Sequence, residues 1–215
     1  MSPIPAPSVL QEGQMDILRM AAKCFAERGY NATSIDDVAR RLGCTKGRIY
    51  HFFASKADLF FGVYRVGMDT CFEAIRNTYQ SDAPAFERLQ KMSLCHTVTM
   101  MKTKSFQRVV REGVEIHVRG ATTPEQRETL EELLEIRRQY SLIFREVMEQ
   151  AKEDGDLSYP NIGIAVQLIF MSLNSPVYWY KERPGQTEED IKKLAHQVVV
   201  YALTGLGADR GRILQ

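Results

Sequence analysis

The sequence predicts an all-α protein in which a small N-terminal three-helix module precedes a larger helical domain. From residue 84 onward apolar residues recur at helical spacing, and no stretch shows the two-residue alternation that indicates a strand. Glycine and proline residues fall between these apolar stripes, where helices begin or end. We expect two short helices within 34–53 and further helices at 15–28, 56–79, 84–103, 105–118, 124–153, 161–180 and 187–206.

Residues 34–53 form the pattern on which the functional interpretation depends. Ser34 can cap a helix, and Asp37 stands three residues later, where it completes an acidic capping box. Gly43 supplies the left-handed conformation that a sharp turn after this helix requires. The apolar residues between cap and turn follow a buried helical stripe; they are Ile35, Val38, Ala39 and Leu42. This is the layout of a helix-turn-helix, whose second helix enters the DNA major groove.

Positive charge is concentrated on the same element. Between residues 40 and 56 there are five basic side chains and no acidic one; they are Arg40, Arg41, Lys46, Arg48 and Lys56. Because the whole chain carries +1, the remaining residues together carry −4. The alternative is a solvated charged face, but charge together with the cap, stripe and glycine turn favours a polyphosphate partner.

Other features limit the remaining function classes. Residues 1–12 are proline-rich and are expected to form a flexible tail rather than a signal peptide. No apolar run is expected to approach the roughly 18 residues needed to span a bilayer. The four cysteines are widely spaced, as in a cytoplasmic protein with reduced thiols; they are Cys24, Cys44, Cys71 and Cys95. No histidine has a second ligand at helical spacing and no phosphate loop or nucleophile motif stands out, so we expect no metal, no cofactor and no enzyme.

The stretch from Ile17 to about Val66 resembles the TetR family of transcriptional regulators. The matching motifs are Ile-Leu-x-x-Ala-Ala-x-x-Phe-Ala-Glu-Arg-Gly-Tyr, Ala-Thr-Ser-Ile-Asp-Asp-Val-Ala, Leu-Gly-Cys-Thr-Lys-Gly-Arg-Ile-Tyr-x-x-Phe and Ser-Lys-x-x-Leu. The resemblance implies a tail at 1–12, a helix-turn-helix DNA-binding domain at 13–55 and a helical effector-binding and dimerisation domain at 56–209.

The resemblance also implies which residues contact DNA. Those expected to contact phosphates are Thr33, Ser34, Tyr50 and Lys56, and those expected to read bases at the start of the recognition helix are Thr45, Lys46, Gly47 and Arg48. Many family members carry a histidine two residues after the matched tyrosine. Here that position is Phe52, and the neighbouring His51 is the alternative phosphate contact.

The helical domain holds a candidate effector site. Its mostly apolar walls with a few polar groups would be formed by Met92, Cys95, His96, Thr99, Phe106, Val110, Tyr140, Phe144, Phe170, Asn174 and Tyr178. The alternative is that these side chains fill a core, and Asn174 either satisfies backbone groups at a proline kink or faces a ligand.

Two late apolar helices predict a four-helix dimer interface, the alternative being that they complete a monomer core. The predicted interface residues are Ile169, Leu173, Ile191, Leu194, Ala195, Val198, Val199 and Ala202.

Together these features predict a homodimeric repressor that reads a palindromic operator on double-stranded DNA and is released by a small effector. Residues 174–190 look like family branches that sense acyl-CoA or related lipophilic metabolites. The alternatives are an activator or ligand-independent DNA-binding protein, and a helical enzyme or carrier that uses its N-terminal module for assembly.

Overall fold

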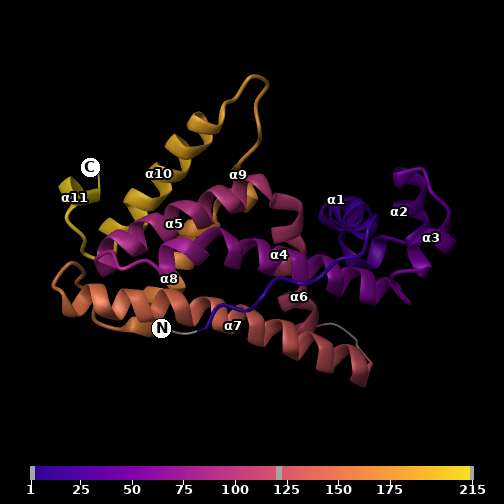
Figure 1. Cartoon of the computed structure of the whole chain (residues 1–215), viewed down its shortest axis with the longest axis horizontal. Coiled ribbons are helices and arrows are strands. Elements are labelled where there is room, and N and C mark those ends of the chain that lie inside the picture. Colours follow the sequence, from indigo (N-terminus) through magenta and orange to yellow (C-terminus); the bar gives the residue numbers. More distant parts are fainter. Residues whose placement is uncertain (1–2, 120–122, 214–215) are drawn as a thin grey trace. The chain divides into compact units, whose positions relative to one another are not determined.

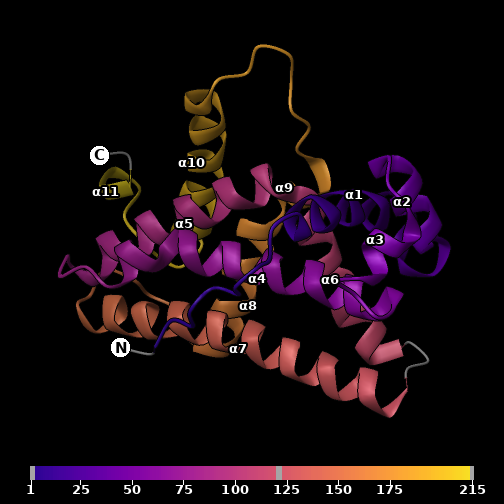
Figure 2. The same ribbon diagram turned by 45° about the vertical axis from the view of Figure 1, so that its right-hand side comes forward.

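The computed structural model describes residues 3–119 and 123–213, and within these ranges every regular element is a helix (Figures 1 and 2). The helices are α1 (Gln14–Ala32), α2 (Ile35–Leu42), α3 (Lys46–Tyr50), α4 (Lys56–Tyr79), α5 (Ala85–Lys102), α6 (Lys104–Arg119), α7 (Pro124–Glu153), α8 (Ile162–Asn174), α9 (Pro176–Trp179), α10 (Glu188–Thr204) and α11 (Arg210–Ile213). The all-α prediction is confirmed.

One expected helix is interrupted. The segment predicted as a single helix over 161–180 is divided at Ser175 into α8 and α9. Pro176 has no backbone N–H and occupies the first position of α9, so the hydrogen-bond ladder of α8 cannot continue through it. The short α11 was not expected from the sequence.

The chain forms two compact units. The N-terminal unit comprises residues 5–70 and 103–137, and the C-terminal unit comprises residues 1–4, 71–102 and 138–215. The sequence predicted a boundary after residue 55, whereas the N-terminal unit also includes residues 56–70, α6, which packs against α1, and the first part of α7. Both α4 and α7 contribute residues to the two units.

In the N-terminal unit, α6 contacts both the end of α1 and the first part of α4. The Glu112 carboxylate accepts a 2.6 Å hydrogen bond from the backbone N–H of Tyr30, at the end of α1. Gly67 allows α4 and α6 to approach closely, since a Cβ at this position would lie 2.8 Å from the Val110 side chain. These contacts build a core around the buried apolar face of α1.

In the C-terminal unit, α5 packs against both α8 and α10. One of its buried clusters joins Met101, Tyr180, Ile191 and Ala195, with Leu94, Val98 and Leu194 packed against it. The tertiary contacts therefore place the inner stripe of α10 against α5 and the segment after α9.

The expected tail has no helix or strand over residues 3–10, and residues 1–2 lie outside the described part. Within it, the Ser8 backbone N–H donates a 3.0 Å hydrogen bond to the Asp69 carboxylate on α4.

The apolar character of α8 and α9 requires a correction. Ile162–Trp179 is an 18-residue stretch of mean hydropathy 1.3, so the expectation that no apolar run approaches membrane-spanning length is wrong here. Core helices of soluble proteins meet the same criteria of length and composition. Because only 28% of the stretch is buried within the chain, it presents an apolar surface.

Candidate functional sites

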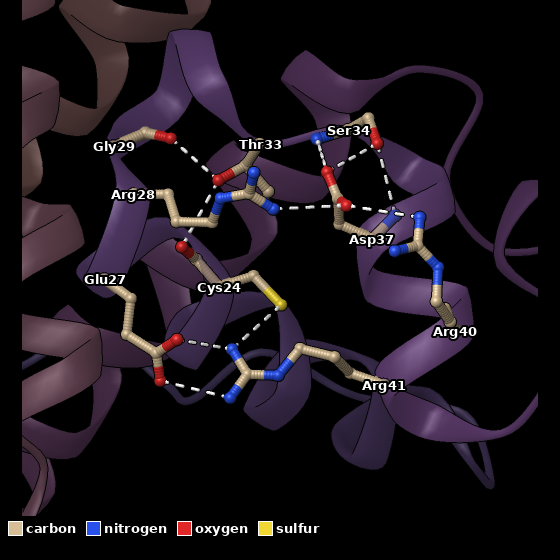
Figure 3. Close-up of polar contacts among 9 residues, drawn as sticks. All are labelled: Cys24, Glu27, Arg28, Gly29, Thr33, Ser34, Asp37, Arg40 and Arg41. Atoms are coloured by element: carbon tan, nitrogen blue, oxygen red, sulfur yellow. Dashed lines mark hydrogen bonds and ion pairs between the residues drawn. The ribbon is translucent and has the colours of Figure 1, made fainter.

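The start of α2 forms the predicted capping box (Figure 3). The Ser34 hydroxyl accepts from the Asp37 backbone N–H at 3.1 Å, and the Asp37 carboxylate accepts from the Ser34 backbone N–H at 3.0 Å and from its hydroxyl at 2.7 Å. These bonds from Ser34 lower the pKa of Asp37 to about 2. The exposed Ser34 therefore stands at a helix N-terminus, where backbone N–H groups favour an anion.

Two exposed arginines flank this helix start. Arg28 and Arg40 lie 3.1 Å and 3.4 Å from the same carboxylate oxygen of Asp37. Neither was assigned a contact from the sequence, although Arg40 lies in the basic run. Their positions add two positive groups beside the anion-favouring end of α2.

The turn between α2 and α3 is the predicted glycine turn. Gly43 adopts φ 70° and ψ 32°, and its N–H donates to the carbonyls of Ala39 and Arg40, which close α2. Thr45 then caps α3, and Ile49 and Phe53 are buried, which anchors the recognition helix to the module.

The opposite face of α3 is exposed. It carries Thr45, Lys46, Gly47, Arg48, Tyr50 and His51, all predicted to contact DNA. The Lys46 ammonium lies 2.6 Å from the Asp36 carboxylate on α2. A Cβ added at Gly47 would meet no atom closer than the Thr45 hydroxyl at 3.8 Å, so the backbone there is open to an approaching surface. The ring of Phe52 is half-buried beside His51.

Two residues predicted to contact phosphates, Thr33 and Lys56, have side chains that make hydrogen bonds within the protein. Thr33 is buried, and its hydroxyl donates to the Gly29 carbonyl at 2.7 Å, so the predicted phosphate contact of this side chain is corrected to a role in closing α1 (Figure 3). The Lys56 ammonium donates to the Tyr30 carbonyl at 2.9 Å and lies 4.3 Å from the centroid of the Tyr30 ring. Lys56 is half-buried, also donates to the Asn31 carbonyl at 3.5 Å and keeps one further N–H, so its phosphate contact stays a prediction.

The Arg41 side chain also makes its contacts within the protein. Its guanidinium makes a two-pronged ion pair with the Glu27 carboxylate at 2.5 Å and 3.2 Å, which lowers the pKa of Glu27 (Figure 3). The same guanidinium lies 3.8 Å from the buried Cys24 sulfur, and burial raises the pKa of that thiol. Arg41 thus joins α2 to α1.

In the C-terminal unit, six of the predicted effector residues lie together or on one helix face. His96 on α5 is hydrogen-bonded through Nδ1 to the Tyr140 hydroxyl of α7 and through Nε2 to Oδ1 of Asn174 on α8, each at 2.9 Å. The rings of Phe144 and Phe170 lie 5.9 Å and 5.6 Å from the imidazole. Met92 lies one turn before His96 on α5 and is fully buried. We call His96, Tyr140 and Asn174 the polar triad.

Burial keeps the polar triad uncharged. Desolvation lowers the pKa of His96 to about 4, while the hydrogen bond that His96 donates to Asn174 acts in the opposite direction. Burial also raises the pKa of Tyr140 well above its usual range, and the nearby thiols of Cys71 and Cys95 act in the same direction. Both rings are therefore neutral at pH 7.

The other predicted effector residues have different surroundings. Cys95 is half-buried, and the Thr99 hydroxyl donates to the Cys95 carbonyl one turn earlier. Tyr178 is exposed on α9, outside the buried core. Phe106 and Val110 belong to the N-terminal unit, where they pack against Gly67 of α4.

The predicted dimer residues require a correction. Six of the eight are buried within the single chain; they are Ile169, Leu173, Ile191, Ala195, Val199 and Ala202. Leu194 and Val198 are half-buried. For Ile169 and Leu173 the reason is that α8 is apolar on most faces, and periodicity alone does not tell which face turns inward.

The exposed apolar residues lie on another face of α8. Ile164, Leu168 and Met171 follow the spacing i, i+4, i+7 and form what we call the α8 stripe. Leu168 is 53% exposed and Met171 is 70% exposed. Tyr178, Trp179 and Tyr201 are further exposed aromatic side chains of the same unit. The spacing of Ile164, Leu168 and Met171 is visible in the sequence and is the signal that could identify this face.

Comparison with known families matches both parts of the chain. Residues 17–63 match the family described as bacterial regulatory proteins, tetR family. Residues 82–206, more than half of the chain, match the tetracyclin repressor-like C-terminal domain.

Individual relatives agree with these matches. The chain is 25% identical to the HTH-type transcriptional repressor KstR2 of Rhodococcus jostii over 97% of this chain and 98% of that protein. It is 40% identical to KstR2 of Mycobacterium tuberculosis over 75 residues, which are 35% of this chain and 38% of that protein. The structure of the ketosteroid transcriptional regulator KstR2 of Mycobacterium tuberculosis superposes with a TM-score of 0.77 at 23% identity, covering 94% of this chain and 98% of that chain, which establishes a common fold.

Proposed function

Because this chain belongs to the TetR family of transcriptional regulators, we propose that it is a homodimeric repressor, released from a palindromic operator by a small lipophilic or acyl-CoA-type effector. The observation that carries the DNA-binding part is the exposed face of α3, which presents Lys46, Arg48 and Tyr50 next to the capped start of α2. Such a protein would act in the cytoplasm, where its operator lies.

The division of labour on this surface follows from side-chain chemistry. Lysine and arginine can donate to the N7 and O6 acceptors of guanine, so Lys46 and Arg48 are proposed to read bases. Ser34, Tyr50, Lys56 and the arginines Arg28 and Arg40 are proposed to bind phosphates, which position the module without reading sequence.

A dimer is supported by the α8 stripe. Three large apolar side chains at i, i+4 and i+7 would cost free energy if left in water, and a second copy of the helix can cover them. Two modules related by a twofold axis would then place their recognition helices in successive major grooves, about one helical turn apart.

The effector class is supported by the surroundings of the polar triad, which consist mainly of aromatic rings. The relatives named above are described as a transcriptional repressor and as a ketosteroid transcriptional regulator, and a lipophilic effector would suit both descriptions. The effector would release DNA only by binding the DNA-incompetent conformation more tightly. Because α4 contributes residues to both units, we propose it as the element that carries the displacement.

The test uses a DNA fragment from upstream of the protein's own gene in fluorescence anisotropy. Substituting Lys46→Ala together with Arg48→Ala is expected to weaken operator binding at least about a hundredfold, because each base contact contributes about 1–3 kcal/mol. Tyr50→Phe is expected to weaken binding to all sequences alike.

The matched control is Lys91→Ala with Arg145→Ala, which removes the same charge from exposed positions on α5 and α7. Operator affinity equal to wild type in the Lys46/Arg48 variant, or equal losses in both double variants, would refute the recognition-helix assignment.

A further inference from the structure

The polar triad joins three helices of the C-terminal unit through a single imidazole. His96 on α5 contacts Tyr140 on α7 through one ring nitrogen and Asn174 on α8 through the other. The three partners lie 44 and 78 positions apart in the chain, so the arrangement is tertiary. His96 is 2% exposed and Tyr140 is 4% exposed.

The direction of the hydrogen bonds follows from donor and acceptor chemistry. Oδ1 of Asn174 only accepts, so Nε2 of His96 must carry the imidazole hydrogen. Nδ1 is then the acceptor, and the Tyr140 hydroxyl donates its hydrogen to it. Two hydrogen-bonding groups are not used within the triad. They are the lone pairs of the Tyr140 oxygen, which can accept, and the N–H groups of the Asn174 amide, which can donate. Within the described residues, no hydrogen bond engages that amide nitrogen.

The surroundings of the Tyr140 oxygen and the Asn174 amide are apolar and uncharged. The rings of Phe72, Phe144 and Phe170 lie 5.0 to 6.0 Å from the Tyr140 ring. The titratable groups that act on Tyr140 are the thiols of Cys71 and Cys95, and both act to raise its pKa. A charged ligand group placed here would lose its hydration without gaining a counter-charge, whereas a neutral carbonyl oxygen has a much smaller desolvation cost, which a hydrogen bond can offset.

The accessible side of the cluster is α8. Phe170 and Asn174 are one turn apart on this helix, and both are half-buried, unlike His96, Tyr140 and Phe144. A ligand that enters from this side meets the amide N–H groups of Asn174 first. An amide N–H is a donor, and its complement on a lipophilic molecule is a carbonyl oxygen.

Asn174 also occupies a position from which binding can alter the fold. It is the last residue of α8, and Ser175 and Pro176 interrupt the helix directly after it. The Ser175 hydroxyl accepts a 3.2 Å hydrogen bond from the indole N–H of Trp179, which is half-exposed on α9. A ligand that rearranges the Asn174–His96 bond would therefore act on the junction between α8 and α9.

We propose that the polar triad is the recognition element for the effector, and that it selects a neutral carbonyl oxygen on an apolar body over a free carboxylate. This inference rests on the proposed function, since it names the chemistry of the ligand that would release the repressor. Ketones, esters and the thioester end of an acyl chain carry this oxygen, and a fatty-acid anion does not.

The experiment compares three ten-carbon probes, 2-decanone, decane and decanoate, by calorimetric titration of the full-length protein at pH 7.5. We expect 2-decanone to bind at least about tenfold more tightly than decane or decanoate, the size of one buried hydrogen bond. In Asn174→Leu this preference for the ketone should disappear, and in Tyr140→Phe the His96 imidazole should lose its Nδ1 partner, with a change in its ring ¹⁵N chemical shifts. Tyr201→Phe, at a position on α10 that is 83% exposed, is the control and should behave as wild type.

Equal affinity for 2-decanone and decane, tighter binding of decanoate, or a ketone preference that survives in Asn174→Leu would overturn the proposal, as would failure of all three probes to bind. Operator binding is measured in parallel on each variant. If a variant still binds operator and a metabolite still releases it while the ketone preference is absent, the triad assignment fails and the proposed function stands. If wild type does not bind operator, the proposed function itself fails.

Discussion

The Lys46 ammonium on the recognition helix lies 2.6 Å from the Asp36 carboxylate on the preceding helix. Both side chains are about half exposed, so the pair is screened by water and contributes little to stability. The ion pair has a greater effect on DNA binding. Lys46 is proposed to donate to a base, and to do so its ammonium must break the ion pair with Asp36 or donate to both groups.

Asp36→Asn should therefore strengthen operator binding by about two- to fivefold at low salt, which corresponds to a surface ion pair of less than about 1 kcal/mol. Anisotropy titrations at two salt concentrations would measure this gain. Asp16→Asn removes the same charge from the first turn of α1, where Asp16 pairs with Arg19, and is the control. An equal gain in both variants would mean that net charge, and not release of Lys46, is responsible.

Gly47→Ala should separate folding from DNA binding. Since a Cβ here meets nothing closer than 3.8 Å, we expect the free energy of unfolding to stay the same or rise by up to about 1 kcal/mol, because alanine is the better helix former. Operator affinity should fall at least about tenfold if the backbone approaches the groove at this position. Urea denaturation and anisotropy measure the two effects. Undiminished operator affinity would show that Gly47 does not lie against DNA.

The α8 stripe predicts how to obtain a monomer. Leu168→Glu combined with Met171→Glu should shift the dimer dissociation constant by at least about a hundredfold, because two charges would have to be desolvated in an apolar interface. Light scattering coupled to size-exclusion chromatography measures the mass. Lys91→Glu on the exposed face of α5 is the charge control and should remain dimeric. A double variant that stays dimeric would exclude the stripe as the interface.

The buried imidazole predicts a pH dependence of stability. The pKa of His96 is about 4 in the folded chain and 6.5 when unfolded, so the unfolded chain binds one more proton between these values. The contribution of the neutral imidazole is complete above pH 6.5 and is lost as the pH falls toward 4, by up to about 1.4 kcal/mol per pH unit.

His96→Gln does not titrate, so the difference between wild type and this variant isolates the effect. Urea denaturation at pH 4.5, 5.5 and 7 should give a difference in the free energy of unfolding that shrinks as the pH is lowered. A difference that is independent of pH would mean that His96 is not held neutral. Asp37, whose pKa is about 2, titrates below this window and does not interfere.

The helix-turn-helix and the polar triad differ in how far apart their interacting residues lie in the sequence. Ser34 and Asp37 are three residues apart, and the bonds that form the capping box need only the local backbone. The turn at Gly43 is equally local. For this reason the sequence alone was sufficient to predict the helix-turn-helix, the Ser34 cap of its first helix and the glycine turn that follows.

Tertiary structure decided the features that depend on remote partners. The sequence does not show that the Thr33 hydroxyl is turned onto the end of α1, or that Arg41 pairs with Glu27. It lists apolar residues on every side of α8, but only packing against α5 and α10 determines which of them are buried and which form the exposed stripe. The polar triad is the clearest case, because its geometry exists only when three helices meet. Local hydrogen bonds are encoded within a few residues, whereas burial depends on the whole chain.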